Sequence, residues 1–290
     1  MWWIGAALAA GQTEFEVTRT DIANTYEFHW KDEAGRRHDA RFALPAPAVQ
    51  ADNAAPRKPP LDEMSQHQAR IVRQWARDLE GVELTVTATG AGLEFNVSGR
   101  DKGRMKRVLT KAQALAEEAA DDWLLANDVM TMEGGGLSMD HAKLVPAYVD
   151  DVAPVAAAIP GADPRAWADN ALAFVQAIPY EIRADGADKG FRRPLSVIDR
   201  NKGDCDSKST LFLAMLAAAH PGVESAMVYV PGHALVALAL PPRAGDDTVE
   251  IRGRDWILAE PVGPAEYRVG ETGTGHARQA KRGEIHMVER

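Results

Sequence analysis

The cysteine at position 205 is the only one in the chain, and it stands at the start of a segment with helical spacing. The apolar residues of this segment share one helical face: Leu211, Phe212, Met215 and Leu216. Gly203 and Asp204, just before the cysteine, are typical of a turn followed by a helix cap. Because the N-terminus of a helix favours the thiolate, the sequence predicts a lowered pKa for Cys205 and a role as nucleophile.

Two further residues can complete a catalytic set. His233 follows a Pro-Gly turn and opens an apolar segment, 233–240, that is typical of a buried strand. Glu260 ends the next strand candidate, 255–260, directly before a proline. In such a set the imidazole takes the thiol proton and later protonates the leaving group, while the acid orients the imidazole.

Each of these residues also has an ordinary interpretation. A single cysteine is often an inert buried side chain, a histidine on an apolar strand is often part of the core, and an acid before a proline is often solvated. The polar residues around Cys205, which are Asp204, Asp206, Ser207 and Lys208, favour an exposed helix entry over a core position.

Gln176 is the candidate for a second oxyanion donor beside the backbone N–H of Cys205, on chemical type alone. Its alternative is an ordinary residue on a helix surface. We expect no metal and no cofactor, because the eight histidines are scattered without close pairing and one cysteine cannot build a thiolate site. The glycine-rich segment 270–275 lacks the strand and the Lys-Ser/Thr of a phosphate-binding loop.

Three stretches of the chain together resemble the core of the transglutaminase-like superfamily of cysteine enzymes. They are Gly-Asp-Cys-Asp-Ser-Lys-Ser at 203–209, Pro-Gly-His-Ala at 231–234, and a tryptophan-containing strand that ends at Glu260 and Pro261. The segment 171–180 and the Arg-Pro-Leu at 193–195 look like the helix and loop that lead into that core. The resemblance covers about residues 140 to 265.

This resemblance implies an α+β fold in which a papain-like core of helices packs on an antiparallel sheet. By matching position it implies Cys205 as the nucleophile, His233 as the base and Glu260 as the orienting acid. Many members of the superfamily carry aspartate at the third position, where this chain has a glutamate that is one methylene longer.

Hydrophobic patterning predicts a smaller α+β module at 13–130 before a catalytic domain at 138–268. The module comprises a hairpin at 13–44, a proline-rich loop at 45–60, a helix at 62–79, a second hairpin at 82–98 and a helix at 102–126. Residues 269–290 are predicted to form a partly mobile tail. Residues 1–12 are apolar and end in a small-residue pattern, so they are interpreted as a truncated secretory signal or as an apolar segment that docks on the fold.

Composition limits the partners. A net charge of −9 over 290 residues argues against nucleic acid, and the basic run at 100–107 is interpreted as a solvated helix face. Beyond the N-terminus no apolar run approaches the ~18 residues of a membrane span. The signal-like N-terminus favours a periplasmic or secreted protein, with a cytoplasmic location as the alternative.

Two functions are compatible with these patterns. The first is cysteine-dependent acyl transfer on protein or peptide amides, in which the acyl group goes to water in proteolysis or deamidation, or to an amine in cross-linking. The second is a catalytically silent protein of the same fold that binds a peptide or a protein.

Overall fold

The computed structural model describes residues 11–90, 92–132, 135–181, 190–263 and 266–288. The chain divides into two compact units, one formed by Met1–Arg57 with His141–Arg290 and the other by Lys58–Asp140. The predicted single module at 13–130 is therefore wrong, because its first strands belong with the C-terminal part of the chain. The apolar segment at 1–12 lies almost wholly outside the described residues.

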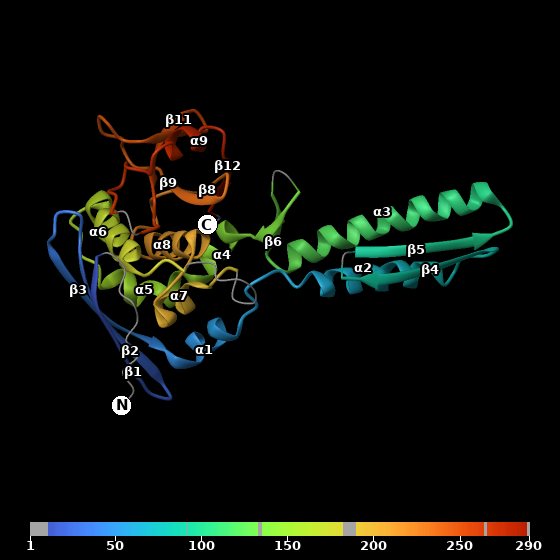
Figure 1. Ribbon diagram of the computed structural model, residues 1–290, viewed down its shortest axis with the longest axis horizontal. Coiled ribbons are helices and arrows are strands. Elements are labelled where there is room, and N and C mark those ends of the chain that lie inside the picture. The colour runs from blue at the N-terminus through green and yellow to red at the C-terminus, as the bar shows by residue number, and fades with distance from the viewer. Residues whose placement is uncertain (1–10, 91, 133–134, 182–189, 264–265, 289–290) are drawn as a thin grey trace. The chain divides into compact units, whose positions relative to one another are not determined.

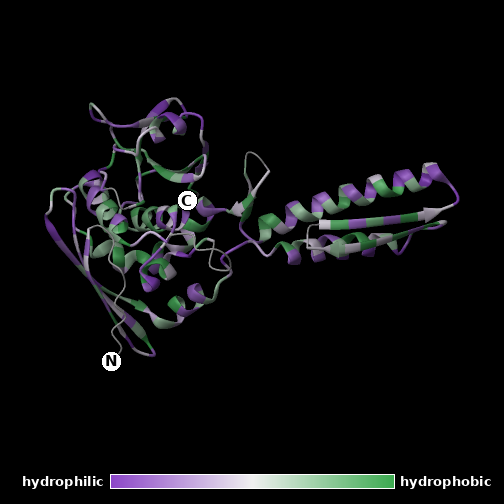
Figure 2. Cartoon of the chain, in the orientation of Figure 1, coloured by the Kyte–Doolittle hydropathy of each residue, from purple (hydrophilic) through white to green (hydrophobic). Residues whose placement is uncertain are grey.

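The second unit is a helix pair packed on a β-hairpin. Its elements are α2 (Leu61–Ala76), β4 (Val82–Thr89), β5 (Gly92–Gly99), α3 (Lys102–Ala126), β6 (Val129–Thr131) and β7 (Leu137–Met139). Small and branched side chains from α2, β4 and α3 form its core: Ala69, Val72, Val86, Ala112 and Ala116. Alternating polar and apolar bands along α3 show this amphipathic packing (Figure 2). The predicted helices and second hairpin are confirmed.

The first unit combines helices with two antiparallel sheets. Its helices are α1 (Ala46–Ala54), α4 (His141–Leu144), the 3-10 helix η1 (Val145–Tyr148), α5 (Val149–Ala157), α6 (Pro164–Ala177), α7 (Pro194–Arg200), α8 (Cys205–Ala219) and α9 (His276–Ala280). Figure 1 shows α8 in the middle of this unit, with α5, α6 and α7 packed around it. The predicted proline-rich loop at 45–60 is wrong over α1, since Pro45 and Pro47 fall at the N-cap and in the first turn, where a helix tolerates proline.

A five-stranded antiparallel sheet in the order β10-β11-β9-β8-β12 packs on the other side of α8. Its strands are β8 (Ser225–Val230), β9 (His233–Leu238), β10 (Thr248–Ile251), β11 (Arg254–Ala259) and β12 (Glu284–Met287). β12 pairs with β8, so the predicted mobile tail at 269–290 is wrong. The end of the chain completes the sheet, since pairing with β12 satisfies backbone groups on the edge of β8.

A second sheet, of three antiparallel strands, joins the N-terminal residues to this unit. It consists of β1 (Gln12–Arg19), β2 (Ala23–Lys31) and β3 (Arg37–Pro45). Alternation along β2 buries Phe28 and Trp30, and their rings meet that of Phe174 on α6 at centroid distances of 5.1 and 5.3 Å. This aromatic packing explains why β1–β3 belongs with α6, although more than 100 residues separate them in the sequence.

The whole fold is α+β with antiparallel sheets, in agreement with the predicted class. In the described ranges, none of the helices is both long enough and apolar enough to pass through a lipid bilayer.

Candidate active site

Cys205 is the first residue of α8, as predicted. Asp204 caps the helix in an extended conformation, and its carboxylate accepts hydrogen bonds from the backbone N–H of Ser207 at 3.2 Å and from the Ser207 hydroxyl at 2.5 Å. The cap places the thiol at the helix entry, where it is only 3% exposed.

The surroundings of the thiol differ from those expected. Ser207 and Lys208 are fully buried, so the predicted exposed helix entry is wrong. The ammonium group of Lys208 donates to the carbonyl oxygens of Ile178 at 2.7 Å and Gln176 at 3.3 Å, which draws the polar end of the lysine into the core. Burial lowers the pKa of Lys208 to about 7.

The predicted lowering of the Cys205 pKa is also wrong for this arrangement. Burial of the thiol, followed by the charge of Asp206, raises the pKa of Cys205 well above its ordinary value. The thiol donates a hydrogen bond to Asp206 Oδ1 at 2.9 Å, which stabilises the protonated form. A hydrogen bond from the backbone N–H of Ala234 acts in the opposite direction but does not outweigh these effects. The resting sulfur is therefore a neutral thiol.

His233 and Glu260 lie on neighbouring strands of the five-stranded sheet. His233 opens β9, and Glu260 directly follows β11, which pairs with β9. His233 Nε2 lies 3.0 Å from Glu260 Oε1. Burial alone would raise the pKa of Glu260, but hydrogen bonds from His233, from the N–H of Gly273 and from His276 hold it below its ordinary value. The buried carboxylate is thus ionised and holds the imidazole.

The sulfur lies at the same end of β9 as the imidazole. Ala234, whose N–H bonds the sulfur, is the residue immediately after His233, and α8 packs directly on β9. The fold therefore places the sulfur against the backbone of the residue that follows His233, with Cys205 on one helix and His233 and Glu260 on two adjacent strands.

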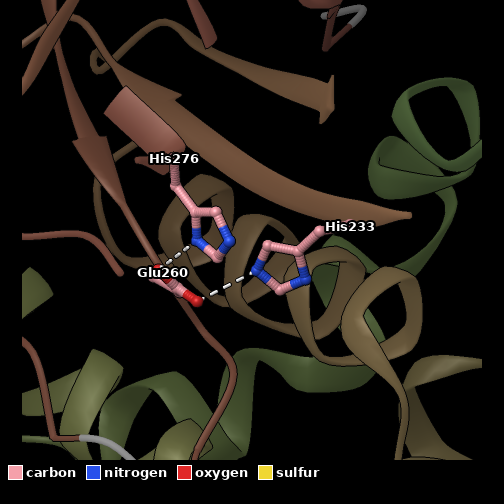
Figure 3. A group of neighbouring side chains, drawn as sticks. All are labelled: His233, Glu260 and His276. Carbon is pink, nitrogen blue, oxygen red and sulfur yellow. Dashed lines mark hydrogen bonds and ion pairs between the residues drawn. The ribbon is translucent and has the colours of Figure 1, made fainter. Parts of the chain in front are cut away.

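A second histidine, which the sequence patterns did not indicate, meets the same carboxylate. His276 on α9 places Nδ1 3.1 Å from Glu260 Oε2, and its ring lies 4.6 Å from that of His233, centroid to centroid. Figure 3 shows the two rings next to each other, both directed at the Glu260 carboxylate. The expectation of unpaired, scattered histidines is wrong here. The only local signal was the glycine-rich segment before His276, which forms a turn over the carboxylate rather than a phosphate loop.

Gln176 is buried, and its amide is fully engaged with the backbone. Its two N–H donors go to the carbonyl oxygens of Glu260 at 2.9 Å and Tyr267 at 3.1 Å, and its oxygen accepts from the N–H of Tyr267 at 3.2 Å. Neither the expected oxyanion role nor a helix-surface role fits these contacts. Gln176 instead holds the chain that follows β11, and so the position of Glu260.

His141 is a further residue that sequence patterns missed. It is 1% exposed, its Nδ1 lies 2.7 Å from the hydroxyl of Tyr229, and its Nε2 lies 3.8 Å from Asp206 Oδ2. The thiol of Cys205 bonds the other oxygen of Asp206. Asp206 therefore lies between the thiol of Cys205 and the imidazole of His141.

Comparison of the chain with protein-family models, with curated proteins and with solved structures finds no match. The transglutaminase-like resemblance consequently stays a prediction.

Proposed function

We propose that this protein is a cysteine-dependent acyl-transfer enzyme acting on protein or peptide amides, built on a transglutaminase-like core. Cys205 is the nucleophile, His233 the general base and acid, and Glu260 the orienting carboxylate. The observation that carries the proposal is the contact of His233 Nε2 with the ionised carboxylate of Glu260. The residue after His233, Ala234, donates a backbone hydrogen bond to the sulfur of Cys205.

The Glu260 contact selects the tautomer of the base. When Nε2–H donates to the carboxylate, Nδ1 carries the lone pair and can accept a proton from the thiol. The sulfur then attacks the amide carbonyl carbon and forms a C–S bond, with the negative charge on the carbonyl oxygen. As the C–N bond breaks, Nδ1–H returns its proton to the departing amine, which leaves a thioester on Cys205.

The raised pKa of Cys205 specifies when the proton moves. The thiol that donates to Asp206 is protonated before substrate binds, so its proton is transferred to His233 during the attack. The S–H must therefore turn from Asp206 to Nδ1 of His233 before the proton can move. The helix N-terminus helps at that moment, because its dipole stabilises charge that develops on the sulfur.

The thioester is then consumed by water or by an amine. In both cases His233 removes a proton from the attacking group and a new C–O or C–N bond forms. The C–S bond then breaks, and the proton on His233 passes to the sulfur and regenerates the thiol. Proteolysis, deamidation and cross-linking all follow from this chemistry, and access of water to the thioester decides among them.

The test uses an activated acetyl ester as acyl donor, with intact-mass detection of acetylated protein and optical detection of turnover. We expect acetylation at Cys205 in the wild type, none in Cys205→Ala, and a rate lower by about 10²-fold or more in His233→Ala, because general base catalysis contributes that much. His286→Ala is the control, since His286 pairs with Glu284 on edge strand β12. Equal acylation rates in wild type and His233→Ala would contradict the proposal.

The burial of Cys205 favours one alternative function. A neutral thiol that is 3% exposed is also what a catalytically silent protein of this fold would have, with a peptide or protein as its partner. In that case the ester would acetylate surface lysines, and the Cys205→Ala and His233→Ala variants would behave like the wild type.

A further inference from the structure

We propose that His233, Glu260 and His276 form a binding site for a transition-metal ion of the zinc class. The three residues offer two imidazole nitrogens and a carboxylate, a donor set suited to Zn²⁺. All of these donor atoms lie within 4.8 Å of one another. The site is defined by its ligands and does not depend on the proposed enzymatic function.

The spacing of the donor atoms is close to what a metal requires. Two ligand atoms of a tetrahedral zinc ion are about 3.3 Å apart at ordinary bond lengths. His233 Nε2 lies 3.0 Å from Glu260 Oε1 and His276 Nδ1 lies 3.1 Å from Glu260 Oε2, so both nitrogens are already next to the carboxylate. The two nitrogens must approach each other to bind one ion, and each neutral ring moves its proton to its other nitrogen when it coordinates the metal.

The surrounding loop is built closely around these ligands. The N–H of Gly273 donates to Glu260 Oε2 at 2.7 Å. A Cβ at position 273 would lie 2.9 Å from His276 Nδ1 and 3.3 Å from Glu260 Oε2, so only glycine lets the backbone pass this close to both ligands. A hydrogen bond to the carboxylate of a ligand fixes its orientation toward a metal, and the N–H of Gly273 supplies one to Glu260.

A cation can reach the site from solvent. The side chains of His233 and His276 are 16% and 27% exposed, whereas that of Glu260 is 7% exposed. A buried carboxylate below two partly exposed imidazoles leaves the outer side open for a fourth ligand, such as water. One orienting carboxylate needs only one imidazole, so the second histidine is what completes a donor set.

Metal binding has a consequence that rests on the proposed function. A metal on Nε2 of His233 replaces the hydrogen bond to Glu260 and withdraws the base, so bound Zn²⁺ should inhibit acyl transfer reversibly. The metal site and the enzyme are tested separately, because binding is measured without any substrate.

The experiment is a titration of chelator-treated full-length protein with Zn²⁺, followed by calorimetry and by competition with a chromogenic chelator. We expect one Zn²⁺ per chain, affinity at least 10-fold weaker in His276→Ala and in Gly273→Ala, and unchanged affinity in His286→Ala, which removes a histidine–carboxylate pair on β12 that includes none of the three proposed ligands. Cys205→Ser should also bind normally, because the thiol is not among the ligands. Thermal unfolding without metal verifies that each variant is folded.

Three results would overturn the site. They are the absence of stoichiometric Zn²⁺ binding in the wild type, equal affinity in His276→Ala and His286→Ala, and loss of binding in Cys205→Ser. If Gly273→Ala does not fold, His276→Gln serves in its place, since it keeps a polar side chain but removes the imidazole. A protein that binds Zn²⁺ as expected but shows no acylation would retain the metal site and refute only the enzyme.

Discussion

His233 Nε2 lies 3.0 Å from Glu260 Oε1, at the junction of two neighbouring strands. This contact sets the tautomer of the imidazole, and it depends on a carboxylate that the backbone of Gly273 and the ring of His276 hold in its ionised form. Four predictions about the site and the fold follow from contacts of this kind.

Replacement of Glu260 by glutamine removes the charge but keeps the shape. Because an amide can also present an N–H to Nε2, the imidazole loses its fixed tautomer, and we expect acylation of Cys205 to slow by about 10²-fold or more. Glu250→Gln, at an exposed position on β10, is the matched control. Acylation at the wild-type rate in Glu260→Gln would show that the carboxylate has no orienting role.

Replacement of Asp206 by asparagine should make the thiol more acidic. Among neighbouring charges Asp206 contributes most to the raised pKa of Cys205, so its neutralisation shifts the deprotonation of the thiol to lower pH. The rate of alkylation by iodoacetamide, measured from neutral pH to the highest pH at which the protein stays folded, should increase at lower pH in the variant, so that the midpoint of the profile shifts down. Asp255→Asn, exposed on β11, should leave the profile unchanged. An unshifted midpoint in Asp206→Asn would mean that burial alone controls the thiol.

Lys208 should make the stability of the protein depend on pH. Its folded-state pKa is about 7 and its ordinary value 10.5, so between these values the unfolded chain binds a proton that the folded chain does not. The free energy of unfolding should therefore rise from pH 7 to 10, by on the order of 3 kcal/mol, and the cost of burying the charge is fully present below pH 7. In Lys208→Met this contribution should vanish from urea unfolding curves, whereas the exposed Lys281→Met should retain it. If the free energy of unfolding rises equally with pH in Lys208→Met and in the wild type, the lowered pKa of Lys208 is not the cause.

Phe174 should stabilise the first unit alone. Its ring joins α6 to the β1–β3 sheet, so Phe174→Ala should leave a cavity and cost about 3 to 5 kcal/mol. Hydrogen exchange should report faster opening of β1–β3 and α6, with α2, α3 and the β4–β5 hairpin unaffected. The control is Ile22→Ala, since Ile22 is 82% exposed. Equal destabilisation of both units would refute the division of the chain at Arg57 and His141.

The amino-acid sequence by itself determined the features that depend on neighbouring residues. The start of α8 at Cys205, the strand after the Pro-Gly turn at His233 and the long helix α3 all follow from caps, turns and periodicity within about 20 residues. The residue types of the candidate triad were visible for the same reason.

Only the tertiary structure decided which distant residues share one site. The pairing of β12 with β8 returns the chain to the sheet after α9, whose His276 meets Glu260, and the packing of Phe28 on Phe174 assigns the first strands to the same unit as α6. The thiol of Cys205 is neutral for a similar reason, since burial and the charge of Asp206 outweigh the helix dipole. Burial and long-range contact depend on how elements pack in space, and local sequence patterns carry little information about that packing.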